Sequence, residues 1–443
     1  MISNNVVLFS AFAACALAAP TTSPNLSKRL SGPTDIWKVP ARLDPNDPKS
    51  LAWKQVNLVE ATIDTAADDG RLFSYYPATY NAGGSVYVMF SGSSKDIDGM
   101  GQDVRISYRT NDGWSKPEIA FPPALLPNQT TVETSEYYCS RGIPQRALQP
   151  LTIVYTGGGE SSPTYYAVAQ SSDNICPGSF QSAGRVARLL NTPGNEVNGV
   201  FAGEPCWVET NDYTGAHEWA ETVYGTKYQM KVCKDKDAIN AALAKPENVP
   251  AQATSLFNSP LVAADGKHNV SYPTNAVWIG GYSGDGRYMR FWADASTKNR
   301  TGNAFVEYTT DSEGKNWFPA NDDGSSIEQT NIYSSWKAWF GGSDGQEQTR
   351  VYISNSGMSA DSSQVILTVA TSRGSDLAFN NIGVVRGGDA SKTVPQGTRG
   401  PSNTDGPGFY WPSASFSGDE LLVAYSENKA AIHIATIKLS DLP

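Results

Sequence analysis

The sequence predicts an all-β fold, a single β-propeller of four-stranded blades, with seven blades expected and six as the alternative. The 443 residues include 40 Gly, 27 Pro, 21 Tyr and 11 Trp, a composition rich in turns and aromatic side chains. Strand-turn-strand units recur about every 50 to 60 residues, near the repeat length of propeller blades. A helical apolar period is confined to the short piece 234–243.

The first blade is predicted within residues 74–117. The alternating run Gly84–Phe90 indicates a half-buried strand, and the Asp-Gly-Trp turn in Asn111–Trp114 closes a hairpin. Tyr75-Tyr76-Pro77 places polar aromatic tips at a strand end, and Gly101–Arg105 follows on the neighbouring rim. We therefore expect the chemistry of the chain at the rim of this blade.

Later units repeat the same pattern of aromatic and β-branched residues between Gly, Asn, Asp and Ser. They lie at 151–173, 276–309, 349–372 and 421–437. Because the pattern recurs from 151 to 437, a second domain is not expected. Residues 36–443 are therefore expected to form one propeller domain.

The N-terminal segment predicts secretion. Residues 1–19 resemble a signal peptide, with the apolar run Val6–Ala19, although a basic region before it is missing. Residues 20–35 are expected to be a flexible arm or a pro-segment removed at Lys28-Arg29. Outside this leader no apolar run approaches the roughly 18 residues of a membrane span. The mature protein is expected to be extracellular, with no membrane partner.

Cysteine usage agrees with secretion, because an even set remains after the leader. These residues are Cys139, Cys176, Cys206 and Cys233. Two disulfides are the simplest interpretation, and three pairings are open. Nearness in the chain favours Cys139 with Cys176 and Cys206 with Cys233.

Charge and surface motifs narrow the class of partner. The formal charge of -10 gives a field that repels phosphate, so neither nucleic acid nor an anionic membrane is expected as a partner. Asn128, Asn269 and Asn299 begin glycosylation motifs, which predict surface loops of a glycoprotein. A monomer is expected.

One turn signature links the chain to a known family. In Thr310–Trp317, Gly314 allows positive φ and the Trp317 ring covers the hairpin. This resembles the Asp-box of sialidase-type propellers, and Thr110–Trp114 resembles a shortened version. In that family the turn is structural and lies away from the site, which implies that its acidic and Trp residues are not catalytic.

Residues 70–443 resemble the sialidase-fold group that contains ulvan lyases, rhamnose-glucuronate lyases and gum-arabic rhamnosidases. The matching elements are Tyr75-Tyr76-Pro77, Gly101–Arg105, Trp114–Pro117, Asn331-Ile332 with Arg350–Asn355, and Trp411–Lys429. The resemblance implies an enzyme that acts on an extracellular polysaccharide or oligosaccharide. Where the group carries His-His-Pro, this chain has Tyr75-Tyr76-Pro77, so the usual catalytic imidazole is missing. His217 is the one histidine expected at the rim.

The favoured hypothesis is a polysaccharide lyase that cleaves next to a uronic acid by β-elimination, for example at a rhamnose-glucuronate linkage. Elimination needs a cation against the carboxylate, a base and an acid, which Arg and Tyr can supply. A phenol serves as base only where arginines lower its pKa. The catalytic candidates are Tyr75, Tyr76, Tyr137, Tyr138, Arg141, Arg146 and His217.

Two alternatives belong to other classes. A retaining glycoside hydrolase, rhamnosidase or sialidase-like, needs two carboxyl groups or a tyrosine nucleophile backed by a glutamate. A non-catalytic lectin would use aromatic rings as platforms for sugars. The residues expected to contact substrate are Gln102, Arg105, Glu204, Trp207, Glu218, Trp219, Trp336 and Tyr410.

No cofactor is expected. The chain has three His and no Cys-x-x-Cys pair, so a metal site built on these ligands is not predicted. A structural calcium ion is left open.

Overall fold

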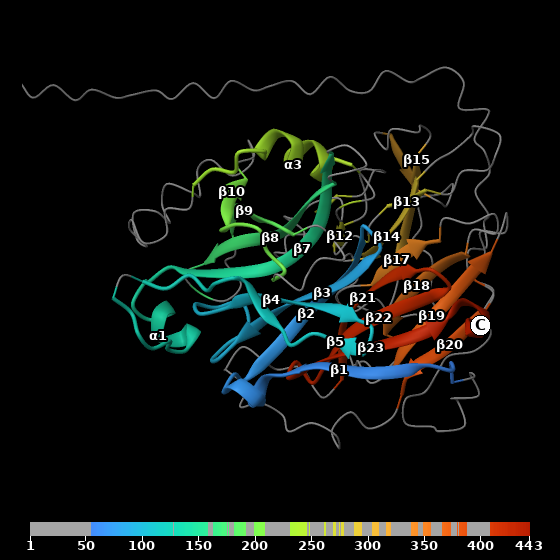
Figure 1. The fold of residues 1–443 in the computed structure, drawn as a ribbon, viewed down its shortest axis with the longest axis horizontal. Helices are drawn as coiled ribbons and strands as arrows, with labels where there is room; N and C mark the ends of the chain where they lie inside the picture. The colour runs from blue at the N-terminus through green and yellow to red at the C-terminus, as the bar shows by residue number, and fades with distance from the viewer. Residues whose placement is uncertain are drawn as a thin grey trace, which may run out of the picture.

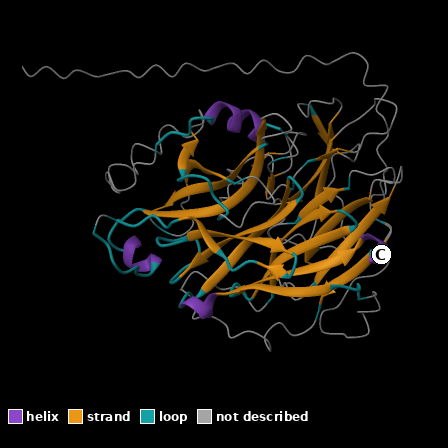
Figure 2. Cartoon of the chain, in the orientation of Figure 1, coloured by secondary structure: helices purple, strands orange, loops and turns teal. Residues whose placement is uncertain are grey.

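The computed structural model describes residues 55–126, 128–157, 163–174, 176, 181–191, 199–208, 231–245, 248, 261–262, 269–271, 274, 276–278, 288–294, 304–309, 316–319, 338–343, 349–355, 366–373, 379, 381–387 and 408–443. Strands dominate these residues, and the few helices are short (Figure 2). The predicted leader 1–19 and arm 20–35 lie outside them. Among the helices of the described part, none is long and apolar enough to cross a membrane.

The first sheet forms where the sequence predicts the first blade. It contains β2 (Phe73–Ala82), β3 (Ser85–Ser93), β4 (Asp103–Thr110), β5 (Gly113–Trp114) and β6 (Glu118–Phe121). The strands are antiparallel, and β6 pairs with β4 beside the short β5. Gly83 and Gly84 both have positive φ, which allows the tight turn from β2 into β3.

The second sheet has the order β10-β9-β8-β7. Its strands are β7 (Gln145–Gly157), β8 (Thr164–Asn174), β9 (Gln181–Leu189) and β10 (Cys206–Val208). Helix α1 (Ser135–Cys139) precedes β7, and α3 (Lys236–Leu243) contacts β7 and β10, which confirms the predicted helix. The disulfides Cys139–Cys176 and Cys206–Cys233 are both present, as chain proximity favoured.

Two further sheets follow. One contains β11 (Leu261–Val262), β12 (Asn269–Ser271), β13 (Val277–Trp278), β14 (Tyr288–Asp294), β15 (Ala304–Thr309) and β16 (Trp317–Pro319). The other contains β17 (Trp339–Gly342), β18 (Thr349–Asn355), β19 (Leu367–Arg373) and β20 (Asn381–Arg386). Asn269 lies in strand β12 rather than in the loop expected for a glycosylation motif.

The last sheet joins the two ends of the described chain. It has the order β1-β23-β22-β21, from β1 (Val59–Thr65), β21 (Phe409–Ser417), β22 (Glu420–Glu427) and β23 (Ala431–Lys438). The N-terminal strand β1 lies along the C-terminal strand β23 (Figure 1). The 3-10 turns η2 (Ala66–Asp69) and η7 (Leu439–Asp441) follow β1 and β23. This pairing joins the N-terminal strand to the C-terminal blade of the propeller.

The apolar core lies between neighbouring sheets. Phe90 of β3 packs against Leu422 and Ile434 of the last sheet, and Tyr87 of β3 packs in a cluster with Leu148 of β7. These contacts are the face-to-face packing of propeller blades. The chain is thus an all-β propeller, as predicted. The described residues form five sheets, so the expected count of seven or six blades is not confirmed.

The strand starts define one face of the propeller. Strand β2 contacts both β7 and β21, and all three begin at the same end as the connections 94–102 and 428–430. We call this end the front face. The Asp-Gly turn between β4 and β5 lies at the opposite end of β4, consistent with the structural role that the resemblance implies for it.

Candidate functional site

Two inner strands carry the same bulge at the front face. In β2 the pairing with β3 shifts between Tyr75 and Ala78, and Tyr76 has φ 52°. In β21 the pairing with β22 shifts between Tyr410 and Ser413, and Trp411 has φ 51°. A proline follows each left-handed residue and cannot donate to the sheet, so the ladder is interrupted at this point.

At each bulge the two aromatic residues differ in exposure. Tyr75 and Tyr410 are buried, whereas Tyr76 and Trp411 are half-buried. The centroids of the Tyr76 and Trp411 rings lie 4.4 Å apart, so the two blades present one joint aromatic surface. Such rings with one accessible side suit the apolar face of a sugar.

Asp98 lies against this aromatic surface. The Tyr76 hydroxyl donates to Asp98 Oδ2 at 2.9 Å, and Gln149 Nε2 donates to Asp98 Oδ1 at 2.6 Å. Hydrogen bonds donated to a carboxylate favour its ionised form. A half-buried tyrosine therefore has its proton directed at a carboxylate oxygen.

The backbone of Asp98 is held as firmly as its side chain. Its N–H donates to Tyr75 Oη at 3.1 Å and to Gln102 Oε1 at 2.8 Å, and its carbonyl accepts from Asn174 Nδ2 at 3.1 Å. Asp98 has φ 59°, a left-handed conformation that Asp tolerates better than most residues. Strands β2, β7 and β8 thus each contribute a contact that holds Asp98 in place.

Lys429 places a cation beside the same aromatic surface. Its Nζ lies 4.8 Å from the centroid of Tyr410 and 5.2 Å from that of Trp411, within the range of a cation-π contact. The Lys429 carbonyl accepts from Ser74 N at 2.9 Å, which ties the β22–β23 turn to the start of β2. We call Tyr76, Trp411, Asp98 and Lys429 the front-face corner. It combines a phenol, an indole, a carboxylate and an ammonium group.

A solved structure described as a sialidase matches the chain with a TM-score of 0.55 and 15% sequence identity, over 91% of this chain and 35% of that protein. At this identity the match shows the fold alone. The fold is a sialidase-type propeller. The chain spans about a third of the length of that sialidase. No protein-family model and no curated protein sequence matches the chain.

Two other solved structures agree less well. The intramolecular trans-sialidase from Ruminococcus gnavus is 9% identical with a TM-score of 0.45, over 86% of this chain and 98% of that protein. A mutant of Trypanosoma rangeli sialidase that displays trans-sialidase activity is 12% identical with a TM-score of 0.44, over 88% of this chain and 59% of that protein.

Among the candidates for the base in this sialidase-type propeller, two tyrosines have raised pKa values. Burial, followed by the charge of Asp98, raises the pKa of Tyr75 well above its ordinary value. Burial also raises the pKa of Tyr138, whose ring packs with Met100 and Ala124. A lyase base needs the opposite direction, which arginine neighbours were expected to supply. Tyr75 and Tyr138 instead act as hydrogen-bonded supports.

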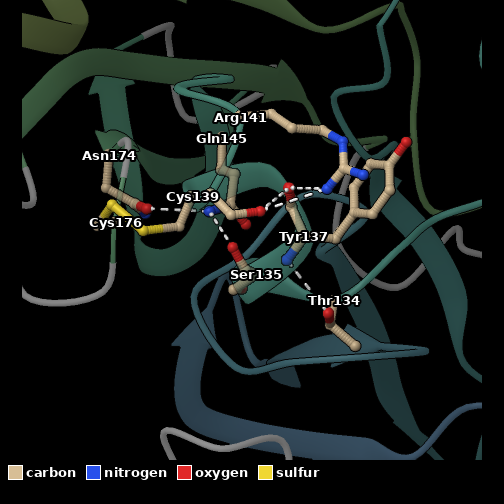
Figure 3. The surroundings of a disulfide bond; sticks show 9 residues. Thr134, Ser135, Tyr137, Cys139, Arg141, Gln145, Asn174 and Cys176 are labelled. Atoms are coloured by element: carbon tan, nitrogen blue, oxygen red, sulfur yellow. Dashed lines mark hydrogen bonds between the residues drawn. A yellow bond between two sulfur atoms is a disulfide. The ribbon is translucent and has the colours of Figure 1, made fainter.

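The two candidate arginines have different surroundings. Arg146 is only 1% exposed and grips Asp173 with two hydrogen bonds of 2.8 and 2.9 Å. Its two-point contact is therefore already used within the protein. Arg141 is exposed, and its guanidinium lies 3.8 Å over the Tyr137 ring while it donates to the Tyr137 carbonyl at 3.1 Å (Figure 3).

Two of the residues expected to contact substrate, Gln102 and Arg105, instead have partners within the protein. Gln102 is buried and bridges the Tyr75 hydroxyl to the Leu148 carbonyl, so it ties β2 to β7 beneath the bulge. Arg105 forms ion pairs with Asp69 at 2.6 Å and Asp103 at 3.1 Å. These two residues hold strands and connections in place.

Trp207 and Tyr410 are both buried, and the Trp207 ring lies under the Arg146 guanidinium at 5.2 Å. Glu204 is exposed just before β10. The remaining candidates, His217, Glu218, Trp219 and Trp336, lie outside the described residues.

Sequence reasoning missed Asp98, Gln149 and Lys429. Asp98 is preceded by Asp96 in the connection between two predicted strands of the first blade, and a carboxylate pair at a rim was the available signal. Gln149 gave no signal, because its role depends on a contact across two blades. Within the described residues no group of three His, Cys, Asp or Glu side chains could hold a metal ion, and calcium stays untested.

Proposed function

We propose that this protein is a secreted, carbohydrate-active enzyme, a retaining glycoside hydrolase in which Tyr76 is the nucleophile and Asp98 its base. The observation that carries the proposal is the 2.9 Å hydrogen bond from the Tyr76 hydroxyl to Asp98 Oδ2 at the front face. A tyrosine nucleophile backed by a carboxylate is one of the recognised solutions for glycoside cleavage. Here the carboxylate is an aspartate.

The first half-reaction follows from this geometry. Tyr76 Oη attacks the anomeric carbon as its proton passes to Asp98 Oδ2, and the bond from that carbon to the leaving oxygen breaks. An acid must protonate the leaving oxygen. His217 or Glu218 is proposed for this step, because the segment that carries them was expected at the rim.

The second half-reaction returns the enzyme to its starting state. A water molecule activated by the group that acted as acid attacks the anomeric carbon from the opposite face to Tyr76. The Tyr76 oxygen leaves and takes back the proton held by Asp98. Two inversions give a product with retained configuration.

The surrounding residues suit a sugar ring. Trp411 and Tyr76 form the aromatic surface, and Lys429 adds positive charge beside it. Gln149 and the Asp98 backbone contacts keep the carboxylate fixed while charge moves. Preorganised polar groups of this kind lower the cost of reorganisation during reaction.

The hydrolase is preferred to the lyase that the sequence favoured. Elimination by a tyrosine base calls for free cations around the phenol, whereas Arg146 is paired with Asp173 and the pKa of Tyr75 is raised. The hydrolase uses the Tyr76–Asp98 pair as it stands. The rhamnose-glucuronate specificity of the lyase hypothesis is not carried forward.

The wider context of the proposal rests on the sequence and the disulfides. Two disulfides fit an oxidising, extracellular compartment. We propose a secreted glycoprotein whose single domain, residues 36–443, acts as a monomer on extracellular glycans. Nucleic acid and membrane are not proposed as partners.

The test uses the secreted full-length product on a panel of sialosides, rhamnosides and uronic-acid polysaccharides. Hydrolysis predicts new reducing ends without the ultraviolet absorbance of an unsaturated uronate, and NMR should show the retained anomer first. Tyr76→Phe should lower kcat/KM on the order of 10²- to 10⁴-fold. Tyr155→Phe, an exposed tyrosine on β7, is the matched control.

Each contrary outcome has a clear meaning. Ultraviolet absorbance without hydrolysis would restore the lyase. Glycan binding without turnover in either assay would identify a lectin. Equal turnover by Tyr76→Phe and the wild type would remove the nucleophile from the proposal.

A further inference from the structure

The connection 94–102, which carries Asp98, is pressed against the segment that leads into α1. A Cβ added at Gly99 would lie 2.6 Å from Ser135 Oγ. A Cβ at Gly101, which has φ 87°, would lie 2.7 Å from Val132 Cγ2. Both glycines are therefore required by close approach, and neither contact leaves room for the connection to shift toward α1.

Hydrogen bonds join the same two segments. Ser135 N, at the start of α1, donates to Asp96 Oδ2 at 2.5 Å. Gln145 Nε2 donates to the Ser135 carbonyl at 3.3 Å, and Gln145 Oε1 accepts from Met100 N at 3.5 Å. Asp96 and Met100 lie on either side of Asp98, so α1 supports both flanks of the reacting carboxylate.

A second support comes from the end of β8. Asn174 Nδ2 donates to the Asp98 carbonyl at 3.1 Å, and Gln145 Nε2 lies 3.5 Å from Asn174 Oδ1. The disulfide Cys139–Cys176 joins the last residue of α1 to the residue two positions after Asn174 (Figure 3). It thus covalently links the two structures that hold the Asp98 connection.

Helix α1 needs such a link. It has five residues, and helices of this length are not stable by themselves in water. Its buried ring, Tyr138, packs with Met100 and Ala124 in a small cluster that Leu125, Leu126 and Ile143 border. The covalent bond to Cys176 therefore contributes to the order of α1, and through Ser135 to the order of the connection.

We infer that the Cys139–Cys176 disulfide is a positioning element of the reaction, which keeps α1 and the end of β8 together so that Asp98 stays within hydrogen-bond distance of Tyr76. This inference rests on the proposed function. The second disulfide, Cys206–Cys233, lies on β10, the edge strand of the same sheet, next to α3. Its cysteines pack with Val208 of β10 and with Ile239 and Leu243 of α3, so it provides a matched control.

The experiment compares the double variants Cys139→Ser/Cys176→Ser and Cys206→Ser/Cys233→Ser in the secreted full-length protein. Hydrogen exchange is followed by mass spectrometry in peptides that cover 94–102. We expect faster exchange of this peptide in the first variant only. We also expect kcat to fall on the order of 10- to 100-fold with a smaller change in KM, because misplacing a reacting group affects the chemical step.

A further variant covers the case in which the double variant fails to fold. Asn174→Asp keeps the size of the side chain and both disulfides but removes the donor to the Asp98 carbonyl. It should change exchange and kcat in the same direction by a smaller factor.

Unchanged exchange of 94–102, or equal acceleration in both double variants, would overturn the inference. Faster exchange with an unchanged kcat would also overturn it, because the disulfide would then be structural only. If the wild type hydrolyses no glycan, the proposed function fails, and the exchange result still decides whether the disulfide holds the connection.

Discussion

The starts of β2 and β21 use the same backbone device for different purposes. Each has an aromatic pair, a left-handed second residue, a proline and a shift in register. Tyr76 of β2 meets the carboxylate of Asp98, whereas Trp411 of β21 lies beside the ammonium of Lys429. The bulge therefore aims a ring at the front face, and the neighbouring connection decides which charged group lies beside that ring.

The largest effect should come from removing the carboxylate that distinguishes β2. Asp98→Asn keeps the shape and the contact to Tyr76 but takes away the base, and we expect kcat/KM to fall on the order of 10²- to 10⁴-fold. Asp112→Asn, in the exposed turn at the opposite end of β4, should retain wild-type kinetics. Steady-state kinetics on the best glycan provide the measurement. A loss below about tenfold would mean that Asp98 is not the base.

An exchange of rings would test the comparison directly. Tyr76→Trp makes β2 resemble β21 and should abolish turnover, because the nucleophilic oxygen is lost. Trp411→Tyr makes β21 resemble β2 and should raise KM roughly 2- to 10-fold through a smaller stacking surface, with kcat retained. Full retention of activity by Tyr76→Trp would contradict the assignment, and isothermal titration with product would separate binding from turnover.

The cation beside Trp411 should matter less than either ring. Lys429→Met removes the cation-π contacts with Tyr410 and Trp411 and should lower the free energy of unfolding by about 0.5–2 kcal/mol. Lys438→Met, exposed at the far end of β23, is the control. Denaturant titrations of both variants measure the difference. Equal stability of the two variants would show that Lys429 contributes nothing to the corner's packing.

The smallest effect concerns the buried tyrosine beneath the β2 bulge. Because the pKa of Tyr75 is raised above 10.0 in the folded state, the unfolded chain loses that proton first as pH rises. The resulting stability is complete below pH 10 and is lost above it, by up to about 1.4 kcal/mol per pH unit. Tyr75→Phe should flatten the alkaline limb of a stability-pH profile.

Tyr137→Phe, which changes an exposed ring, serves as the comparison for Tyr75→Phe. The profile is measured by denaturant unfolding at a series of alkaline pH values. An unchanged slope for Tyr75→Phe would mean that Tyr75 does not stay protonated in the folded protein at alkaline pH.

Much of the fold could be predicted because its signals are local. The alternation in Gly84–Phe90 predicts the strand that forms as β3, and the Gly83-Gly84 pair allows the tight turn before it. The expectation of a half-buried strand was wrong, because one face of β3 packs on the last sheet and the other on the second sheet. The blade count was not predictable, because it depends on how many sheets close the ring. The identity of β1 as the partner of β23 also joins segments more than 350 residues apart, which no local pattern contains.

The position of the Tyr-Tyr-Pro motif at a strand end could be predicted from the sequence, but its surroundings could not. Tyr75-Tyr76-Pro77 was assigned to the rim and lies there, yet its two tyrosines differ, since one is buried and the other half-buried. Arg146 was expected to act in catalysis by neutralising a substrate carboxylate, because a guanidinium suits carboxylates. That reasoning could not foresee Asp173, which pairs with it across β7 and β8.

The sequence by itself determined the all-β class, the strands of the first blade and the favoured pairing of four cysteines, because alternation, turn residues and nearness in the chain are local signals. Only the tertiary structure decided that Tyr76 meets Asp98, that Trp411 lies beside Lys429 and that Gln149 reaches across from β7. The physical reason is that a bulge fixes where a side chain points, whereas its reactivity is set by charges and donors that packing brings from other blades.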